Sequence, residues 1–228
     1  MNYLFAPTPP TALAIVDSDQ CFPVHRVYCV GRNYADHARE MGADPSREAP
    51  FFFTKPADAV LSNGTTAPYP SQTKELHHEV EMVVALAKGG DNIAVSEALD
   101  CVYGYAVGLD LTRRDLQAQA KAKSRPWCTA KAFDHSAIVG AITAKEQCGH
   151  INEGQIVLSV NDEVRQSGNT NQMIWSVAEI IAELSRFFTL KPGDLIFTGT
   201  PSGVGPLVPG DSFKASVETL AILEGRVS

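Results

Sequence analysis

HHEVEMVVALA (residues 77–87) is the stretch that decides the fold, because its polar and apolar residues alternate with a period of two. Successive side chains of a β-strand point to opposite faces, so Val80, Met82 and Val84 share one face while Glu79 and Glu81 share the other. The apolar residues that follow carry the strand into the interior, where unpaired carboxylates are unfavourable. The stretch therefore predicts a strand that fills a core on one face and holds two carboxylates on the other.

YGYAVGLDLT (103–112) predicts a second strand, which ends at Asp110 just before an expected helix over about 113–123. Thr112 and Asp115 have the spacing of a capping box, which favours the start of a helix there. Carboxylates at the ends of two neighbouring strands would provide the oxygen ligands that hard divalent cations prefer. An exposed strand face and a turn aspartate are the open alternatives, if each element is taken alone.

Two pairs of residues could serve catalysis beside such a site. Arg114 and Gln117 lie three residues apart on the expected helix, where they could bind a substrate carboxylate or carbonyl, or else form a solvated surface. His37 and Glu40 have the same spacing on a helix expected over about 34–41, capped by Asn33. A histidine paired with a glutamate can act as a general base near neutral pH, although an ordinary contact between exposed side chains is the simpler interpretation.

Lys55 and Lys131 each follow an apolar stretch, and either could reach into a site as a fixed cation or lie at the surface. GTPSGVG (199–205) lacks the order of a phosphate loop and predicts a turn that lets the backbone approach a ligand closely. Residues 43–76 are rich in Pro, Ser, Asn and Gly, with FFFTK as their one clear strand, and predict a lid or binding loop.

The remaining elements are short strands bounded by turns, with few helices between them. QIVLSVNDEVRQ (155–166) predicts a hairpin that turns at Asn161-Asp162, and Ser176 and Glu179 form a capping-box pattern at the start of a helix. This order favours an α+β, β-rich fold, a β-roll or mixed sandwich, over a doubly wound sheet.

Composition excludes several classes of protein. The 228 residues carry a net charge of −7 with no long basic stripe, which argues against nucleic-acid binding. Five cysteines without a CxxC pair argue against a disulfide scaffold or a structural zinc site. The first residues lack the basic segment of a signal peptide, and no apolar run approaches the ~18 residues of a membrane span, so we expect a cytoplasmic protein.

Eight segments in this order resemble the fumarylacetoacetate hydrolase family, and most closely its short acylpyruvate hydrolases. The likeness covers nearly all of the chain from about residue 24. The matching segments are VGRNYADHAREMG, FFFTKPADA, HHEVEMVV, GYAVGLDLTRRDLQ, PWCTAKAFD, VNDEVRQSGNT, FFTLKPGDLIFTGTPSGVGP and GDSF. The resemblance implies an N-terminal arm (1–23) and a single catalytic domain (24–228) with the family's mixed β-roll, assembled as a homodimer.

The resemblance also implies a function and a set of site residues. The implied reaction is metal-dependent hydrolysis of an acylpyruvate, with fumarylpyruvate of gentisate breakdown as the nearest substrate. Decarboxylation or tautomerisation of oxaloacetate, and isomerisation or hydration of a related 2-oxo diacid, remain alternatives. Glu79, Glu81 and Asp110 would bind Mg²⁺ or Mn²⁺, without an organic cofactor. The implied catalytic residues are His37, Glu40 and Lys131, and the implied substrate-binding residues are Arg32, Tyr34, Lys55, Arg114, Gln117 and Thr200.

Overall fold

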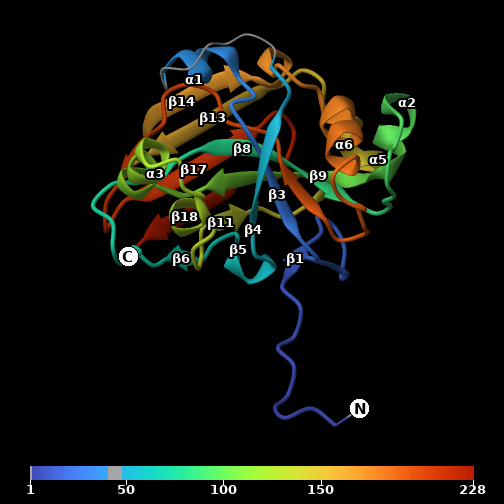
Figure 1. The fold of residues 1–228 in the computed structure, drawn as a ribbon, viewed down its shortest axis with the longest axis horizontal. Helices are drawn as coiled ribbons and strands as arrows, with labels where there is room; N and C mark the ends of the chain where they lie inside the picture. Colours follow the sequence, from blue (N-terminus) through green and yellow to red (C-terminus); the bar gives the residue numbers. More distant parts are fainter. Residues whose placement is uncertain (1, 41–47) are drawn as a thin grey trace.

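The computed structural model describes residues 2–40 and 48–228, and it is built around two large β-sheets (Figure 1). The larger sheet has eight strands in the order β4-β3-β15-β8-β9-β11-β5, with β12 paired to β9. Its strands are β3 (Val27–Gly31), β4 (Phe51–Lys55), β5 (Val60–Ser62), β8 (Val80–Leu86), β9 (Val102–Asp110), β11 (Ala137–Val139), β12 (Thr143–Ala144) and β15 (Leu195–Phe197).

The second sheet has five strands in the order β14-β13-β17-β18-β6. They are β6 (Thr66–Ala67), β13 (Gln155–Val160), β14 (Glu163–Asn169), β17 (Ser212–Val217) and β18 (Leu223–Val227). The predicted hairpin forms β13 and β14, and both turn residues, Asn161 and Asp162, have positive φ, as tight hairpin turns require. The expected β-rich roll of mixed sheets with few helices is therefore confirmed.

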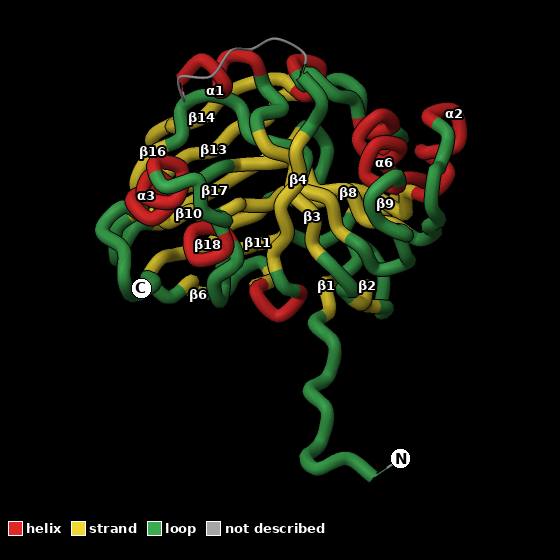
Figure 2. Tube along the Cα trace, in the orientation of Figure 1, coloured by secondary structure: helices red, strands yellow, loops and turns green. Residues whose placement is uncertain are grey.

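Smaller elements complete the fold. A three-stranded sheet and a short hairpin lie beside the large sheets, and the helices lie around the outside (Figure 2). The strands are β7 (Leu76–His78), β10 (Thr112–Arg113) and β16 (Gly205–Leu207), with the hairpin of β1 (Ala12–Ala14) and β2 (Cys21–Pro23). The helices are α1 (Ala35–Glu40), α2 (Val95–Ala98), α3 (Arg114–Ala122), α4 (Cys128–Lys131), α5 (Lys145–Cys148) and α6 (Val177–Ser185).

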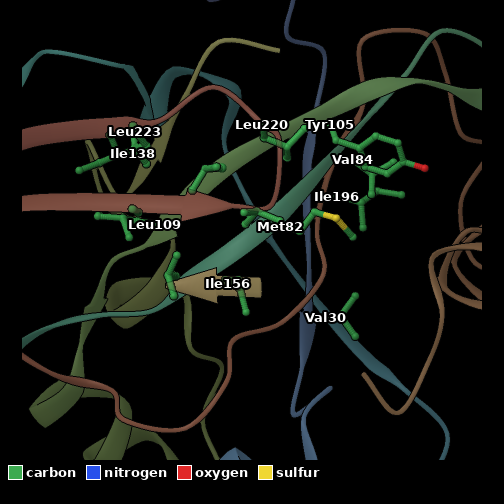
Figure 3. Close-up of a cluster of buried hydrophobic side chains, with 14 of the residues drawn as sticks. Val30, Met82, Val84, Tyr105, Leu109, Ile138, Ile156, Ile196, Leu220 and Leu223 are labelled. Carbon is green, nitrogen blue, oxygen red and sulfur yellow. The ribbon is translucent and has the colours of Figure 1, made fainter. Parts of the chain in front are cut away.

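The main core fills the space between the two large sheets. Met82 and Val84 from β8 and Leu109 from β9 face Ile156 from β13 and Leu223 from β18 in one cluster (Figure 3). Val83 and Ala85 point to the other face of β8, and they belong to a second cluster. The predicted alternation is thus confirmed, and it places Glu81 on the face of the large sheet that lies away from the main core.

The local predictions for residues 77–123 were wrong at two points. The strand expected over 77–87 is two strands, β7 and β8, which belong to different sheets and meet at Glu79. Thr112 does not cap α3, because its hydroxyl donates to the carbonyl of Asp110, while Asp115 accepts from Thr73 and the amide of Lys74. The capping box of Ser176 and Glu179 does form.

The segment expected as a lid contributes strands to three sheets. Within residues 48–76, β4 and β5 join the large sheet, β6 joins the second sheet and β7 joins the third. Backbone pairing on this scale fixes the segment in place, so it cannot swing as one loop. The expectation for 43–47 lies outside the described residues.

The N-terminal segment leaves the body below β1 as an extended arm (Figure 1). The hairpin that follows it contributes Leu13 and Phe22 to the second core cluster, so the later part of 1–23 packs against the body. The described chain contains no helix that is long and apolar enough to cross a membrane.

Candidate active site

Three buried carboxylates lie close together where β8 begins and β9 ends. Glu79 lies between β7 and β8, Glu81 is the second residue of β8, and Asp110 is the last residue of β9. The register aligns Val80 with Leu109, and the amide of Asp110 donates to the carbonyl of Glu79 over 2.9 Å. One carboxylate oxygen from each residue lies within 4.8 Å of the others. The strand pattern therefore does bring these three side chains together.

Three cations surround the carboxylates. Lys131 Nζ, on α4, lies 2.7 Å from Glu79 Oε2 and 2.6 Å from Asp110 Oδ2. Arg114, at the start of α3, donates to Glu79 Oε1 over 2.5 Å. Lys55 Nζ lies 2.7 Å from Asp110 Oδ1 and donates to the carbonyl of Lys131. The three positive side chains thus pair with Glu79 and Asp110 in the interior, where each charge alone would be strongly unfavourable.

The surroundings favour the charged form of Glu79 and Lys131 and disfavour that of Glu81. Burial alone would raise the pKa of Glu79, but Lys131 and Arg114 outweigh it and hold that pKa well below its usual range. Burial would lower the pKa of Lys131, but Asp110 and Glu79 hold it above its usual value. Burial, with Asp110 and Glu79 nearby, raises the pKa of Glu81 well above its usual range. Glu81 is the carboxylate of this group that most lacks positive charge.

The residues present fit a divalent cation. Glu81 accepts a hydrogen bond of 2.6 Å from the amide of Gly199, but within the described chain it forms no ion pair. Asp110 Oδ1 is buried and takes part in no hydrogen bond there, although Lys55 lies beside it. A cation bound by oxygens of Glu79, Glu81 and Asp110 would neutralise Glu81, and such ligands suit Mg²⁺ or Mn²⁺.

Lys131→Met is expected to destabilise the metal-free protein by about 3–5 kcal/mol, because it leaves Glu79 and Asp110 buried with too little positive charge. Urea unfolding in EDTA measures the change. Lys214→Met, which removes an exposed lysine from β17, is the matched control and should stay within about 0.5 kcal/mol of the parent. Equal stability of the Lys131 variant and the parent would contradict the neutralising role of Lys131.

The predicted dyad is formed on α1. His37 Nδ1 lies 3.1 Å from Glu40 Oε2, and the two oxygens of Glu40 also accept from the amide of Gly203 over 3.1 and 3.2 Å. The His37 ring is buried and lines the same pocket as the three carboxylates. Since Nδ1 is paired with Glu40, Nε2 is the nitrogen available for proton transfer in the pocket.

The glycine-rich turn (199–205) holds the carboxylates of Glu81 and Glu40 in place. Gly199 has a φ of 102°, and a Cβ there would lie 2.7 Å from the Cβ of Asn33, so the position favours glycine. Its amide donates to Glu81 and that of Gly203 donates to Glu40. The turn does approach the carboxylate cluster closely, but these two amides bind the protein's own carboxylates, so they are not free to bind a ligand.

Most of the other expected site residues line the same pocket, whose empty volume of about 420 Å³ includes its opening to solvent. Arg114 donates to Gln117 Oε1 over 2.6 Å, and Thr200 Oγ1 accepts from Gln166 over 2.8 Å. The expected residues in the lining are Arg32, His37, Glu79, Glu81, Asp110, Arg114, Gln117, Lys131 and Thr200.

Two of the residues expected to bind substrate lie elsewhere. Tyr34 is buried and borders a different hollow, beside Gln172 and Pro201. Lys55 is buried and forms an ion pair with Asp110 from outside the pocket. Both are neighbours of the site that do not form its wall.

Sequence reasoning missed Lys121 and Trp127, which line the pocket with Phe51 and Phe53. A signal for Lys121 existed, because Arg114, Gln117 and Lys121 follow one another at intervals of three and four residues on one helical face. Trp127 lies in the short connection between α3 and α4, where no periodic pattern applies.

Comparison with known proteins agrees with this geometry. Residues 26–228 match the family described as fumarylacetoacetate (FAA) hydrolase C-terminal. A solved structure of fumarylpyruvate hydrolase from Pseudomonas aeruginosa, in complex with Mn²⁺ and pyruvate, is 53% identical, with a TM-score of 0.97 over 99% of each chain. Fumarylpyruvate hydrolase from Ralstonia sp is 43% identical over 78% of this chain and 92% of its own. A mitochondrial oxaloacetate tautomerase from Mus musculus is 42% identical over 88% of this chain and 90% of its own.

Proposed function

The chain belongs to the fumarylacetoacetate hydrolase family, and from that membership we propose that it is a metal-dependent acylpyruvate hydrolase that cleaves fumarylpyruvate to fumarate and pyruvate. One observation carries the proposal most directly. His37, paired with Glu40, opens into the pocket formed by Glu79, Glu81 and Asp110. A general base that can deprotonate water thus lies in the same cavity as a site for a divalent cation, and that cation can bind a 2-oxo acid.

Glu79, Glu81 and Asp110 would hold the divalent cation, as their shared oxygens and the unpaired charge of Glu81 suggest. When bound, Mg²⁺ or Mn²⁺ supplies Lewis-acid polarisation of the carboxylate and 2-oxo group of the substrate. Mn²⁺ and pyruvate occur together in the structure of the Pseudomonas aeruginosa relative, which supports this choice of ion and of product.

His37 begins the reaction by taking a proton from water at Nε2, while Glu40 orients the ring and stabilises its positive charge. The oxygen of that water forms a bond to the C4 carbonyl carbon. As the C4 carbonyl re-forms, the C3–C4 bond breaks and its electron pair goes to C3, which takes the proton held by His37 to give pyruvate. C4 keeps the oxygen from water and becomes a carboxylate of fumarate.

Lys131 and Arg114 supply fixed positive charge during these steps. Lys131 is held by Glu79 and Asp110 in its charged form, so its ammonium group can stabilise negative charge that develops in the pocket. The guanidinium of Arg114 is oriented by Glu79 and Gln117, and can bind the planar carboxylate of the pyruvoyl end.

Ultraviolet absorbance of fumarylpyruvate tests the proposal. Purified protein with Mg²⁺ or Mn²⁺ is expected to remove the absorbance and to release fumarate and pyruvate in equal amounts. EDTA is expected to stop the reaction, and added Mn²⁺ to restore it. Turnover that continues at the same rate in excess EDTA would contradict the metal-dependent mechanism, and no turnover under any condition would contradict the substrate.

A second activity, on oxaloacetate, is favoured by the 42% identity to the oxaloacetate tautomerase of Mus musculus. Oxaloacetate has the same 2-oxo acid group, and neither its tautomerisation nor its decarboxylation needs an attacking water. Assays of enol–keto exchange and of CO₂ release, beside the fumarylpyruvate assay, measure the two activities separately. A kcat/KM for oxaloacetate above that for fumarylpyruvate would reverse the order of the two proposed substrates.

The oligomeric state, location, pathway and domain boundary of the enzyme are also proposals. We propose a homodimer, a cytoplasmic location, a role in gentisate breakdown, and a single catalytic domain that begins near residue 24. Phe51, Phe187 and Phe188 are exposed, and exposed aromatic side chains are enriched at protein interfaces, which supports the proposed dimer.

A further inference from the structure

Lys121 lies at the outer end of the pocket-lining face of α3. Arg114, Gln117 and Lys121 all line the pocket, and Arg114 at the inner end contacts Glu79. Seven residues of helix separate Lys121 from Arg114, which is about 10 Å along the axis. The face therefore runs from Arg114, beside the carboxylate cluster, to a second cation about two turns further along the helix.

The side chain of Lys121 is positioned by an aromatic ring. Its Nζ lies 5.2 Å from the centroid of Trp127, a distance typical of a cation–π contact. Trp127 is itself packed edge-on against Phe51, with centroids 5.4 Å apart, and against Phe53 at 6.1 Å. These three rings form an apolar wall of the pocket beside the lysine.

The outer end of the pocket has an excess of positive charge. Lys121 is half-buried and Arg32 also lines the pocket, but neither forms an ion pair with an acidic residue of the described chain. The pKa of Lys121 is lowered, first by burial and then by repulsion from Arg114 and Arg32. Unlike Lys131 and Lys55, this lysine has no structural carboxylate to neutralise, and a bound anion would relieve the repulsion.

We propose that Lys121 binds the far carboxylate of a diacid substrate, while the rings of Trp127, Phe51 and Phe53 pack against an unsaturated acyl chain. The inference rests on the proposed function, in which the pyruvoyl end lies at the carboxylate cluster. The terminal carbons of fumarylpyruvate are six bonds apart, the backbone length of two extended residues, or about 7 Å. This length is about 3 Å shorter than the axial separation of Arg114 and Lys121, a gap that two long side chains leaning toward the substrate can close. Lys121 is therefore a specificity residue that selects diacids over monoacids.

The test compares two ligands that the proposed reaction cannot cleave, 2-oxoheptanedioate and 2-oxoheptanoate, which differ in the far carboxylate. Isothermal titration calorimetry with the Mn²⁺-loaded protein gives both dissociation constants. Lys121→Met is expected to weaken the diacid about tenfold to a hundredfold, the effect of one hydrogen bond to a charged group, and the monoacid less than about threefold. Lys123→Met, which removes an exposed lysine next to the end of the same helix, should leave both constants unchanged.

Other outcomes separate this inference from the proposed function. Equal affinity of the parent for the two ligands, or an equal loss for both ligands in the Lys121 variant, overturns the role of Lys121. An equal loss for the diacid in the Lys123 variant overturns it too, because a long-range charge effect would then explain the result. Selective loss without any hydrolysis of fumarylpyruvate would keep the diacid subsite and reject the hydrolase.

Discussion

Glu81→Gln is expected to lower kcat/KM for fumarylpyruvate by at least about a thousandfold, with no loss of folding stability. The large loss follows from removing a proposed ligand charge, since several kcal/mol of charge stabilisation correspond to about three orders of magnitude in rate. Stability is expected to hold because Glu81 has no cationic partner in the described chain, and burial with two neighbouring carboxylates already disfavours its charge. The amide oxygen of glutamine can still accept from the amide of Gly199.

Three measurements check the Glu81 variant: steady-state kinetics, Mn²⁺ binding by calorimetry, and thermal unfolding in EDTA. Weaker Mn²⁺ binding should accompany the loss of activity, while the Tm should equal or exceed that of the parent. Glu75→Gln, an exposed glutamate just before β7, is the matched control and should change none of the three. Parent-like activity and Mn²⁺ affinity in the Glu81 variant would show that Glu81 is not a ligand.

His37→Gln is expected to lower kcat for fumarylpyruvate by about a hundredfold to ten-thousandfold, the usual contribution of a general base. His37 contacts Glu40 and lines the pocket, but it is not one of the three carboxylates, so Mn²⁺ affinity should be preserved. Enol–keto exchange of oxaloacetate needs no attacking water, so any such activity should fall much less than hydrolysis.

Steady-state kinetics with both substrates, together with Mn²⁺ titration, measures this separation. The control is Arg39→Gln, which breaks an exposed i,i+3 pair with Asp36 on the same short helix. The Arg39 variant tests whether α1 tolerates the loss of an i,i+3 pair, and the kinetics of this variant should match those of the parent. Hydrolysis by the His37 variant at the parent rate would exclude the dyad as the base.

The fold was predictable where the signal was local. The alternation in 77–87 correctly separated Met82 and Val84 from Glu81, since strand geometry fixes which face a side chain occupies. The break at Glu79 was not predictable, because it arises from strand pairing: β7 pairs with β10 and β16, while β8 pairs with β9 and β15. The alternation is the same whether the chain stays in one sheet or crosses to another.

The same distinction explains the capping predictions. Ser176 and Glu179 formed their capping box from neighbouring residues. Asp115 had a similar spacing from Thr112 but is bound by Thr73 and Lys74, which lie 42 and 41 residues earlier. A contact made by distant parts of the chain overrides a local preference, and one sequence without its fold does not reveal it.

The site followed the same rule. Glu79, Glu81 and Asp110 were predicted from two strands, and the structure places them together. Lys55 was predicted as a fixed cation that could reach the site, but its pairing with Asp110 was not, because Lys55 comes from a strand at the far edge of the sheet order. Lys121 was accessible from helical spacing alone, but its meaning depends on Trp127, whose position the sequence does not indicate.

The three cations around the carboxylate cluster bear on how the active protein matures. In small zinc domains the ion is part of the folding reaction, and the chain is unfolded without it. Here Lys55, Lys131 and Arg114 already pair with Glu79 and Asp110, and burial raises the pKa of Glu81, so the chain can finish folding before any ion arrives. Loading then becomes a late and reversible step, controlled by the supply of divalent ions after synthesis. A stock stripped with a chelator should keep its shape and regain activity when either Mg²⁺ or Mn²⁺ is added.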